Sequence, residues 1–130
     1  MAKPRVIIST DIGGADPDDM QSMAHALVAA DRYDIKALIS TPSKHGGRAS
    51  HINKALDAYT QDYANLKTWS SYPTPDYLKS VVYQGSINVA PSAGYGSPTS
   101  ASKAIISQAK AAKAAGEPLW VMVWGSMTDV

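Results

Sequence analysis

The sequence predicts an α/β fold, a three-layer, mostly parallel sheet of the doubly wound, Rossmann-like kind. Three runs rich in apolar residues, at residues 6–8, 34–40 and 119–124, have the composition of short strands. Between them lie longer segments in which apolar residues recur at helical spacing. Strands that alternate with helices in this way form parallel sheets with helices on both faces.

Composition limits the classes of protein that need to be considered. The chain has 130 residues, of which 45% are hydrophobic and 18% are charged, as expected for one globular domain. The net charge of +1 gives no electrostatic reason to expect a nucleic acid partner. No apolar run approaches the ~18 residues of a membrane span, and the absence of cysteine excludes disulfides and thiolate metal sites.

The N-terminus bears on localisation. Only five residues precede the first apolar run, which is too short for a signal peptide. The sequence as it stands therefore predicts a cytoplasmic protein. A signal peptide that has been removed would instead imply a secreted or periplasmic one.

The most informative stretch is the acidic loop after the first predicted strand. Four carboxylates, those of Asp11, Asp16, Asp18 and Asp19, fall within nine positions. A helix is predicted to begin at residue 17 or 18 and to end near residue 30. The carboxylates thus follow the carboxyl end of a strand, the edge of an open α/β sheet where ligands bind.

Two interpretations of the acidic loop remain open. Asp16 or Asp18 could cap the helix that follows, where the helix dipole favours negative charge. That role accounts for one or two of the acids. A hard cation accounts for the rest, since closely spaced carboxylates suit Ca²⁺ and, less well, Mg²⁺. The spacing differs from that of an EF-hand loop, which has a glycine at its sixth position and a glutamate at its twelfth.

The second strand, residues 34–40, completes a βαβ unit. Its polar, glycine-rich loop lands beside the acidic loop if the crossover is right-handed. Ser40, Thr41 and Lys44 are therefore candidate substrate contacts, and a solvated turn is the alternative. His45 and His51 are interpreted as surface residues.

The rest of the chain is predicted to contain three helices, a long loop and a final strand. The helices are expected at residues 47–66, 76–83 and 99–115, and the loop at residues 85–98. Thr99 or Ser97 can cap the last helix, and Gly116 suits its left-handed end. The strand at residues 119–124 is apolar throughout and is expected to be central in the sheet.

Two motifs resemble a known family. Thr-Asp-Ile-Gly-Gly-Ala-Asp-Pro-Asp-Asp, residues 10–19, resembles the N-terminal signature of the nucleoside hydrolases, Asp-Thr-Asp-Pro-Gly-x-Asp-Asp. It is closer to the loop of the nucleoside-hydrolase-like proteins labelled cellulose-binding. Residues 118–129 resemble the later strand of that family, which leads into a Gly-Pro-Leu-Thr-Asn turn. The resemblance covers nearly the whole chain, which would be the N-terminal part of a single domain.

The resemblance implies hydrolysis of an N-glycosidic bond in a nucleoside or related riboside. Asp11 matches the aspartate that contacts both the Ca²⁺ ion and the attacking water, so it would be the general base. Asp19 matches the bidentate Ca²⁺ ligand, and Trp124 would offer its backbone carbonyl to the ion. Asp18 matches the residue that binds the sugar hydroxyls. Further candidates for contacts with the sugar are Asp16, Thr41 and Asn88.

The sequence also departs from the family pattern. The loop is longer by three residues, which adds Asp16, and Asp129 replaces the motif asparagine. The family's downstream aspartate ligand and leaving-group histidine would lie beyond Val130, so we expect the 130 residues alone to be inactive. The remainder of the same polypeptide, or a second copy, would complete the sheet and the site.

Two alternatives to hydrolysis stay open. One is a non-catalytic carbohydrate-binding protein of the same fold, which would bind a sugar without turnover. The other is a Mg²⁺-dependent phosphotransfer enzyme. It is disfavoured because Gly13 stands where a haloacid-dehalogenase-like phosphatase has its second aspartate.

Overall fold

A four-stranded parallel sheet forms the centre of the computed structural model, which describes residues 2–14, 16–44, 46–94 and 96–130. His45 lies outside the described residues. The strands lie in the order β3-β2-β1-β4, and every neighbouring pair is parallel. Their bounds are β1 (Arg5–Thr10), β2 (Asp34–Ser40), β3 (Val82–Gln84) and β4 (Leu119–Val123).

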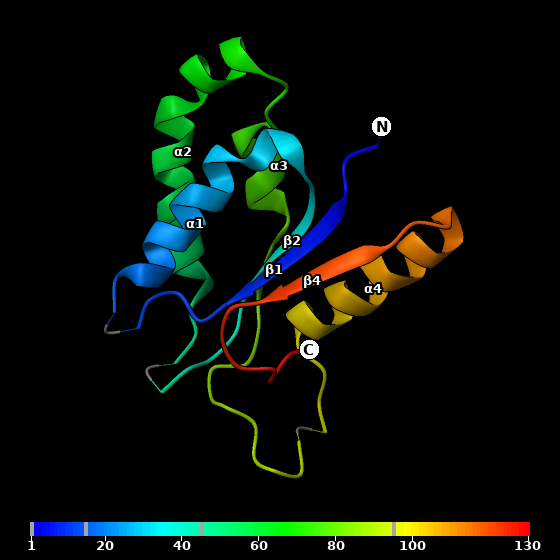
Figure 1. The fold of residues 1–130 in the computed structure, drawn as a ribbon. Helices are drawn as coiled ribbons and strands as arrows, with labels where there is room; N and C mark the ends of the chain where they lie inside the picture. The colour runs from blue at the N-terminus through cyan, green and yellow to red at the C-terminus, as the bar shows by residue number, and fades with distance from the viewer. Residues whose placement is uncertain (1, 15, 45, 95) are drawn as a thin grey trace.

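Helices cover the two faces of the sheet unequally (Figure 1). On one face lie α1 (Asp18–Val28), α2 (Ala49–Trp69) and α3 (Pro75–Ser80), with a short 3₁₀ turn, η1 (Ala30–Arg32), after α1. On the other face lies α4 (Ser100–Ala115). This arrangement confirms the predicted three-layer α/β fold.

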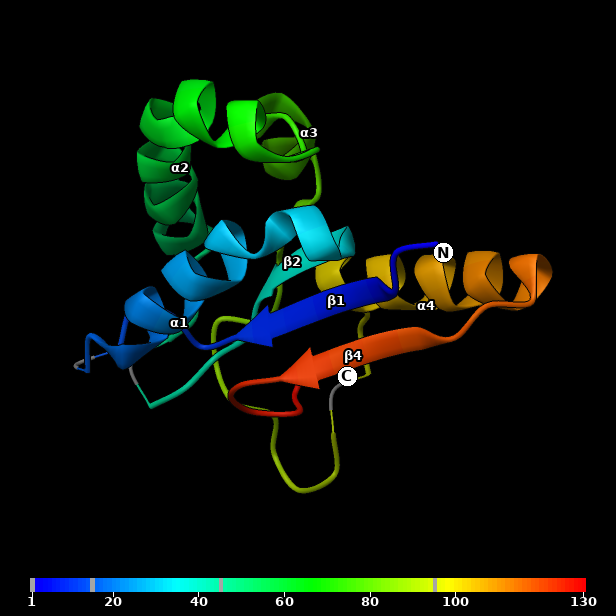
Figure 2. The ribbon, with the colours of Figure 1, turned by 45° about the horizontal axis from the view of Figure 1, so that its top comes forward.

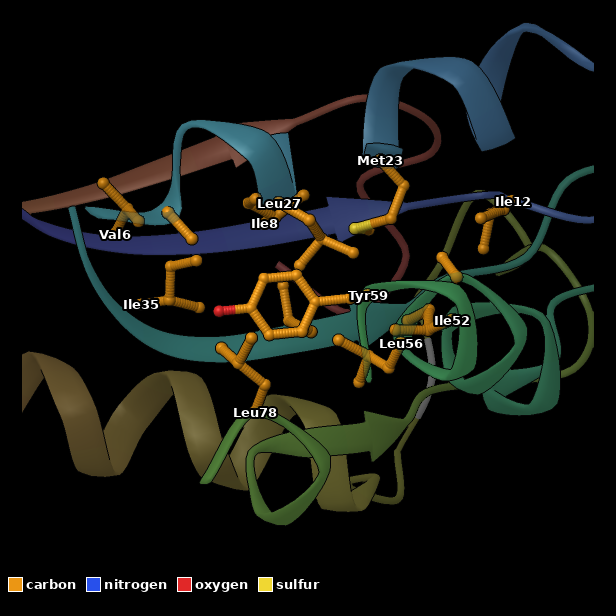
Figure 3. Packing of buried hydrophobic residues seen from close by; sticks show 13 residues of the cluster. Val6, Ile8, Ile12, Met23, Leu27, Ile35, Ile52, Leu56, Tyr59 and Leu78 are labelled. Atoms are coloured by element: carbon orange, nitrogen blue, oxygen red, sulfur yellow. The ribbon is translucent and has the colours of Figure 1, made fainter. Parts of the chain in front are cut away.

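The buried core divides into two clusters that follow these faces. The larger one lies under α1, α2 and α3, where Leu56 and Tyr59 of α2 pack over Ile8 of β1 (Figure 3). The smaller one lies under α4 and consists of Ile7, Ala37, Ile39 and Ala101, with partly buried side chains around them. Successive residues of a strand point to opposite faces, so Ile7 and Ile8 supply one side chain to each cluster.

The termini of α4 are those that the sequence predicts. Thr99 is its N-cap and forms a capping box with Ser102, in which each side chain accepts from the other residue's backbone N–H. Gly116 follows its last residue with a φ of 67°, the left-handed conformation that glycine adopts without strain. No helix within the described residues has both the length and the hydropathy that a membrane span needs.

Residues 82–84 correct the sequence prediction of a helix over residues 76–83. The helix α3 ends at Ser80, and β3 then pairs with the last three residues of β2. A strand of three residues is too short to show a period, and the pairing with β2 overrides the local helical pattern. The second helix also ends later than predicted, at Trp69.

The position of β4 is a second correction. The sequence predicts a central strand, but β4 lies at the edge of the described sheet and pairs with β1 alone (Figure 2). Its Trp120 is 60% exposed and its Val123 is 38% exposed. The strand β4 thus has the apolar composition typical of a strand covered on both faces, but in the described part of the chain several of its side chains are exposed.

Candidate functional site

An open pocket lies at the carboxyl end of β1, where the acidic loop, the loop after β2 and the end of β4 meet. Its volume is about 430 Å³. Four carboxylates line it together with one cation and one aromatic ring; the lining residues are Asp11, Gly14, Asp16, Asp18, Asp19, Ser43, Lys44 and Trp124. The topology therefore brings together the two motifs that the sequence analysis singles out.

Contacts with Thr10 and His51 fix the backbone of the acidic loop. Ile12 is fully buried, and its N–H donates to Thr10 Oγ1 at 3.2 Å. Gly13 has a φ of 103° and lies against the ring of His51, so a side chain there would be strained and would also overlap the imidazole. These contacts fix the loop while leaving Asp16 and Asp18 exposed.

Capping of α1 does not account for the aspartates. The N-cap is Pro17, and no side chain accepts a hydrogen bond there as a cap. Asp18 Oδ1 accepts from the next residue, Asp19 N, at 3.0 Å, and Asp16 makes no cap bond. The two acids in the first turn still interact favourably with the helix dipole.

Asp19 carries the clearest electrostatic signature of the pocket. Partial burial, the negative charges of Asp11 and Asp18, and a side-chain hydrogen bond with Asp11 raise its pKa from 3.8 to about 6. The more distant charge of Asp16 acts in the same direction. The Asp11 and Asp19 carboxyl groups thus lie close enough to share a proton, and a bound cation would relieve the same repulsion.

Asp19→Asn is expected to stabilise the cation-free protein at pH 7.5 and to leave it unchanged at pH 4. Because the folded-state pKa of Asp19 is raised, its contribution to stability is present below pH ~4 and is lost as the pH rises through about 6. Asparagine stays neutral and so avoids this loss in the free energy of unfolding, which we put at roughly 0.5–1 kcal/mol after allowing for solvent screening. Urea denaturation in the presence of a chelator measures it.

The control for this prediction is Asp62→Asn, on an exposed part of α2 outside the pocket. It should change the free energy of unfolding little at either pH. Equal effects of the two substitutions at pH 7.5 would contradict the repulsion between Asp19 and its neighbours.

The end of β4 closes the pocket opposite the acidic loop. Trp124 N donates to Ser9 O at 2.8 Å, which continues the pairing of β4 with β1. Gly125 comes next and lies directly against the Asp11 side chain, since a Cβ built there would be 2.7 Å from Asp11 Cγ. Gly125 therefore leaves the space that the Asp11 carboxylate occupies.

Three of the predicted substrate contacts lie outside the pocket lining. Thr41 is fully buried, and its hydroxyl group contacts Ser126 and Asp129 instead of the pocket. Ser40 is fully buried as well. Asn88 is exposed on the long loop and is absent from the pocket lining. Of the polar residues expected from the loop after β2, Lys44 does line the pocket, beside Ser43.

The residues present fit part of a cation site. Asp11 and Asp19 supply two adjacent carboxylates, and Trp124 lines the same pocket. Within the described ranges, however, no group of three or more His, Asp or Glu side chains is arranged around a common point. The two carboxylates suit a hard cation in charge and donor type, and further oxygen ligands would have to come from backbone, water or bound sugar.

Two residues next to the site carry no sequence pattern that predicts a role for them. One is Gly125, whose contact with Asp11 is only visible once β4 is paired with β1. The other is Asp129, which is 4% exposed and accepts hydrogen bonds from three segments. The position of Asp129 in the second motif is the sequence signal that could have drawn attention to it.

Comparisons with known proteins agree with the fold. Residues 5–130 match the family described as cellulose-binding Sde182, nucleoside hydrolase-like domain. A solved structure, that of a nucleoside hydrolase-related hypothetical protein from Saccharophagus degradans that is associated with carbohydrate metabolism, is 32% identical with a TM-score of 0.82. The match covers 98% of this chain and 32% of that one, so the chain spans about a third of the length of its relative. A comparison with curated proteins gives no match.

Proposed function

Since this chain belongs to the family of nucleoside hydrolase-like domains of the cellulose-binding Sde182 type, we propose that its acidic pocket binds the hydroxyl groups of a sugar or riboside. We further propose that a divalent cation, Ca²⁺ before Mg²⁺, takes part in that binding. The observation that carries the proposal is the Asp11–Asp19 pair, in which partial burial and the negative charge of Asp11 raise the pKa of Asp19 to about 6.

The charge of the pocket supports a cation. Two carboxylates this close are unfavourable at neutral pH unless a proton or a cation lies between them. Within the described residues, no side-chain cap of α1 uses these carboxylates, because its cap position is Pro17 and makes no side-chain bond. Hard oxygen donors prefer Ca²⁺ and Mg²⁺, and the open geometry suits the larger, more adaptable Ca²⁺.

The shape of the pocket supports a polyhydroxylated ligand. Asp16 and Asp18 are exposed at its rim and can accept hydrogen bonds from adjacent hydroxyl groups. Lys44, Ser43 and the aromatic residue Trp124 line the same pocket. This combination of acceptors and one aromatic ring fits a sugar better than an apolar ligand.

Hydrolysis of an N-glycosidic bond is the second candidate. A bound divalent cation supplies positive charge that lowers the pKa of a coordinated water. Asp11, beside Asp19, would then be the residue to accept a proton from the attacking water as general base. A bound cation would keep Asp11 and Asp19 charged, which leaves Lys44 as the described lining residue that carries a proton for the leaving group, and we propose that catalysis also depends on residues outside this chain.

Titration calorimetry with Ca²⁺ tests the cation step. We expect the wild-type chain to bind one Ca²⁺ with a Kd on the order of 10⁻⁴–10⁻³ M, as open sites with few charged ligands do. Asp19→Ala should weaken binding at least about tenfold because it removes one of two carboxylates. Asp62→Asn should leave it unchanged. A wild-type chain that gives no Ca²⁺ heat at millimolar concentration would overturn the proposal.

Sugar binding and turnover are then separated with two probes. Ribose or inosine, added with Ca²⁺, should bind to the wild type and not to Asp18→Ala. Release of hypoxanthine from inosine would establish hydrolysis, and Asp11→Asn should stop it while retaining part of the binding. Binding without release is the result we expect of this chain alone, and it would identify the chain as the binding part of the site.

A further inference from the structure

We infer that Asp129 is a positioning residue for the acidic pocket, although its carboxylate lies outside that pocket. The inference rests on the proposed function, because it concerns the geometry of the same site. It starts from a buried carboxylate that the proposed chemistry does not use.

Asp129 is 4% exposed, and its carboxylate accepts hydrogen bonds from four donor groups. Thr99 Oγ1 donates to Oδ1 at 2.8 Å, and Thr41 Oγ1 donates to Oδ2 at 3.2 Å. Ser86 donates twice, with its backbone N at 3.0 Å from Oδ1 and 3.1 Å from Oδ2 and its hydroxyl group 3.3 Å from Oδ1. All of these donors are neutral, so the carboxylate is held by hydrogen bonds and dipoles.

The donors come from three separate parts of the chain. Thr41 follows β2, Ser86 follows β3, and Thr99 caps α4. Asp129 itself follows β4. One side chain thus ties together the carboxyl ends of three strands and the beginning of a helix, in the region where the loops converge below the sheet in Figure 1.

One of these connections, that through Thr41, leads to the pocket by two routes. Thr41 also contacts Ser126, at 3.4 Å from its carbonyl oxygen and 3.3 Å from its hydroxyl group. The turn that contains Ser126 begins at Gly125, which abuts the Asp11 side chain. On its other side, Thr41 lies two residues before Ser43, which lines the pocket next to Lys44.

The turn after β4 has its own internal hydrogen bonds, which hold its residues together. Ser126 Oγ donates to Thr128 Oγ1 at 2.9 Å, and Val130 N donates to Met127 O at 3.1 Å. A buried, hydrogen-bonded carboxylate at the end of such a turn fixes the position of the turn relative to the neighbouring strands. Asp129 therefore determines how closely Gly125 and Trp124 approach Asp11.

Ca²⁺ calorimetry on Asp129 variants tests this role. Asp129→Ala should weaken Ca²⁺ binding about tenfold, the loss typical when a residue that orients metal ligands is removed. Asp129→Asn keeps the shape and an acceptor for Ser86 N. With the amide nitrogen in the place of Oδ2, the hydroxyl group of Thr41 can rotate to accept from it, while that of Thr99 still donates to the amide oxygen. This variant should remain within about threefold of the wild type. Equal affinities of the wild type and Asp129→Ala would overturn the inference.

A matched pair separates positioning from stability, including the case in which Asp129→Ala does not fold. Thr41→Val and Thr99→Val each remove one hydroxyl donor to Asp129, but only the Thr41 segment reaches the pocket. We expect Thr41→Val to weaken Ca²⁺ binding and Thr99→Val to lower only the melting temperature. Leu78→Ala, which opens the core in α3, should behave like Thr99→Val. Losses of affinity that simply follow the melting temperature in all three variants would contradict positioning.

A wild type that does not bind Ca²⁺ would refute the proposed function, and the inference then has an independent readout. The amide of Trp124 is bonded to Ser9 O and should exchange its hydrogen slowly. In Asp129→Asn this exchange should match the wild type, and in Thr41→Val it should be faster than in Thr99→Val. Identical exchange in the two threonine variants would overturn the inference on structural grounds alone.

Discussion

Gly125→Ala is expected to weaken Ca²⁺ binding by about 10- to 100-fold while the chain still folds. A Cβ at this position would lie 2.7 Å from Cγ, 2.9 Å from Cβ and 2.9 Å from Oδ1 of Asp11. Such separations are too short for non-bonded carbon and oxygen atoms, so one of the two segments must move. The Asp11 side chain is half-buried and can rotate away, and that rotation separates its carboxylate from Asp19.

Calorimetry with Ca²⁺ and urea denaturation, performed on the same sample, measure this effect. The control is Gly96→Ala, because a Cβ at Gly96 meets no atom within 4 Å and its φ lies outside the left-handed region. It should change neither quantity. If Gly125→Ala binds Ca²⁺ as tightly as Gly96→Ala does, the packing of Gly125 on Asp11 does not hold the site together.

The largest expected loss of stability comes from Gly85→Ala, at about 3 kcal/mol or more. A Cβ at Gly85 would overlap both the backbone oxygen of Ser40 and the carboxylate of Asp129. The Ser40 oxygen belongs to a strand and accepts from Gly85 N at 2.9 Å, so it cannot give way without breaking the pairing of β2 with β3. The Asp129 carboxylate is buried and fully hydrogen-bonded, so it cannot move at low cost either.

Urea denaturation of Gly85→Ala beside Gly96→Ala measures the difference, since both exchanges reduce the entropy of the unfolded chain equally. We expect a large decrease in the free energy of unfolding for the first and none for the second. Similar stabilities would show that the segment after β3 can retreat from Asp129, which would also weaken the case for Asp129 as an anchor.

Most of the fold could be predicted from the sequence because its elements have strong local signals. The β-branched run in β1 and the alanine-rich pattern of α4 with Thr99 and Gly116 at its ends each specify one structure. The three-residue strand β3 has no such signal, and only its pairing with β2 defines it. The edge position of β4 is equally a property of the assembled sheet, because an apolar run looks the same at the centre and at the edge.

The candidate site could be predicted in part for a similar reason. Acidic residues that follow a strand lie at a known edge of the sheet, so Asp11, Asp16, Asp18 and Asp19 do meet in one pocket. Neighbouring residues of a loop, however, can point either way, and the sequence does not show that Thr41 turns inward to Asp129 while Lys44 reaches the pocket. Contacts between a glycine and a distant side chain, such as Gly125 with Asp11, leave no local pattern at all.

The unequal covering of the two sheet faces has a consequence for how the molecule opens. In the described part of the chain, three helices bury one face, but α4 alone rests on the other, where its Ala101 joins three fully buried side chains of the sheet. Free energy of local unfolding scales with the apolar contacts that an element would lose, so we expect α4 to detach as a cooperative unit well before the sheet separates. Its N-terminus is the end tied by Thr99 to Asp129, so fraying should begin at Gly116 and spread back toward the loops. The helix that we expect to unfold first, α4, is thus bonded to the rest of the molecule at the end nearest the acidic pocket.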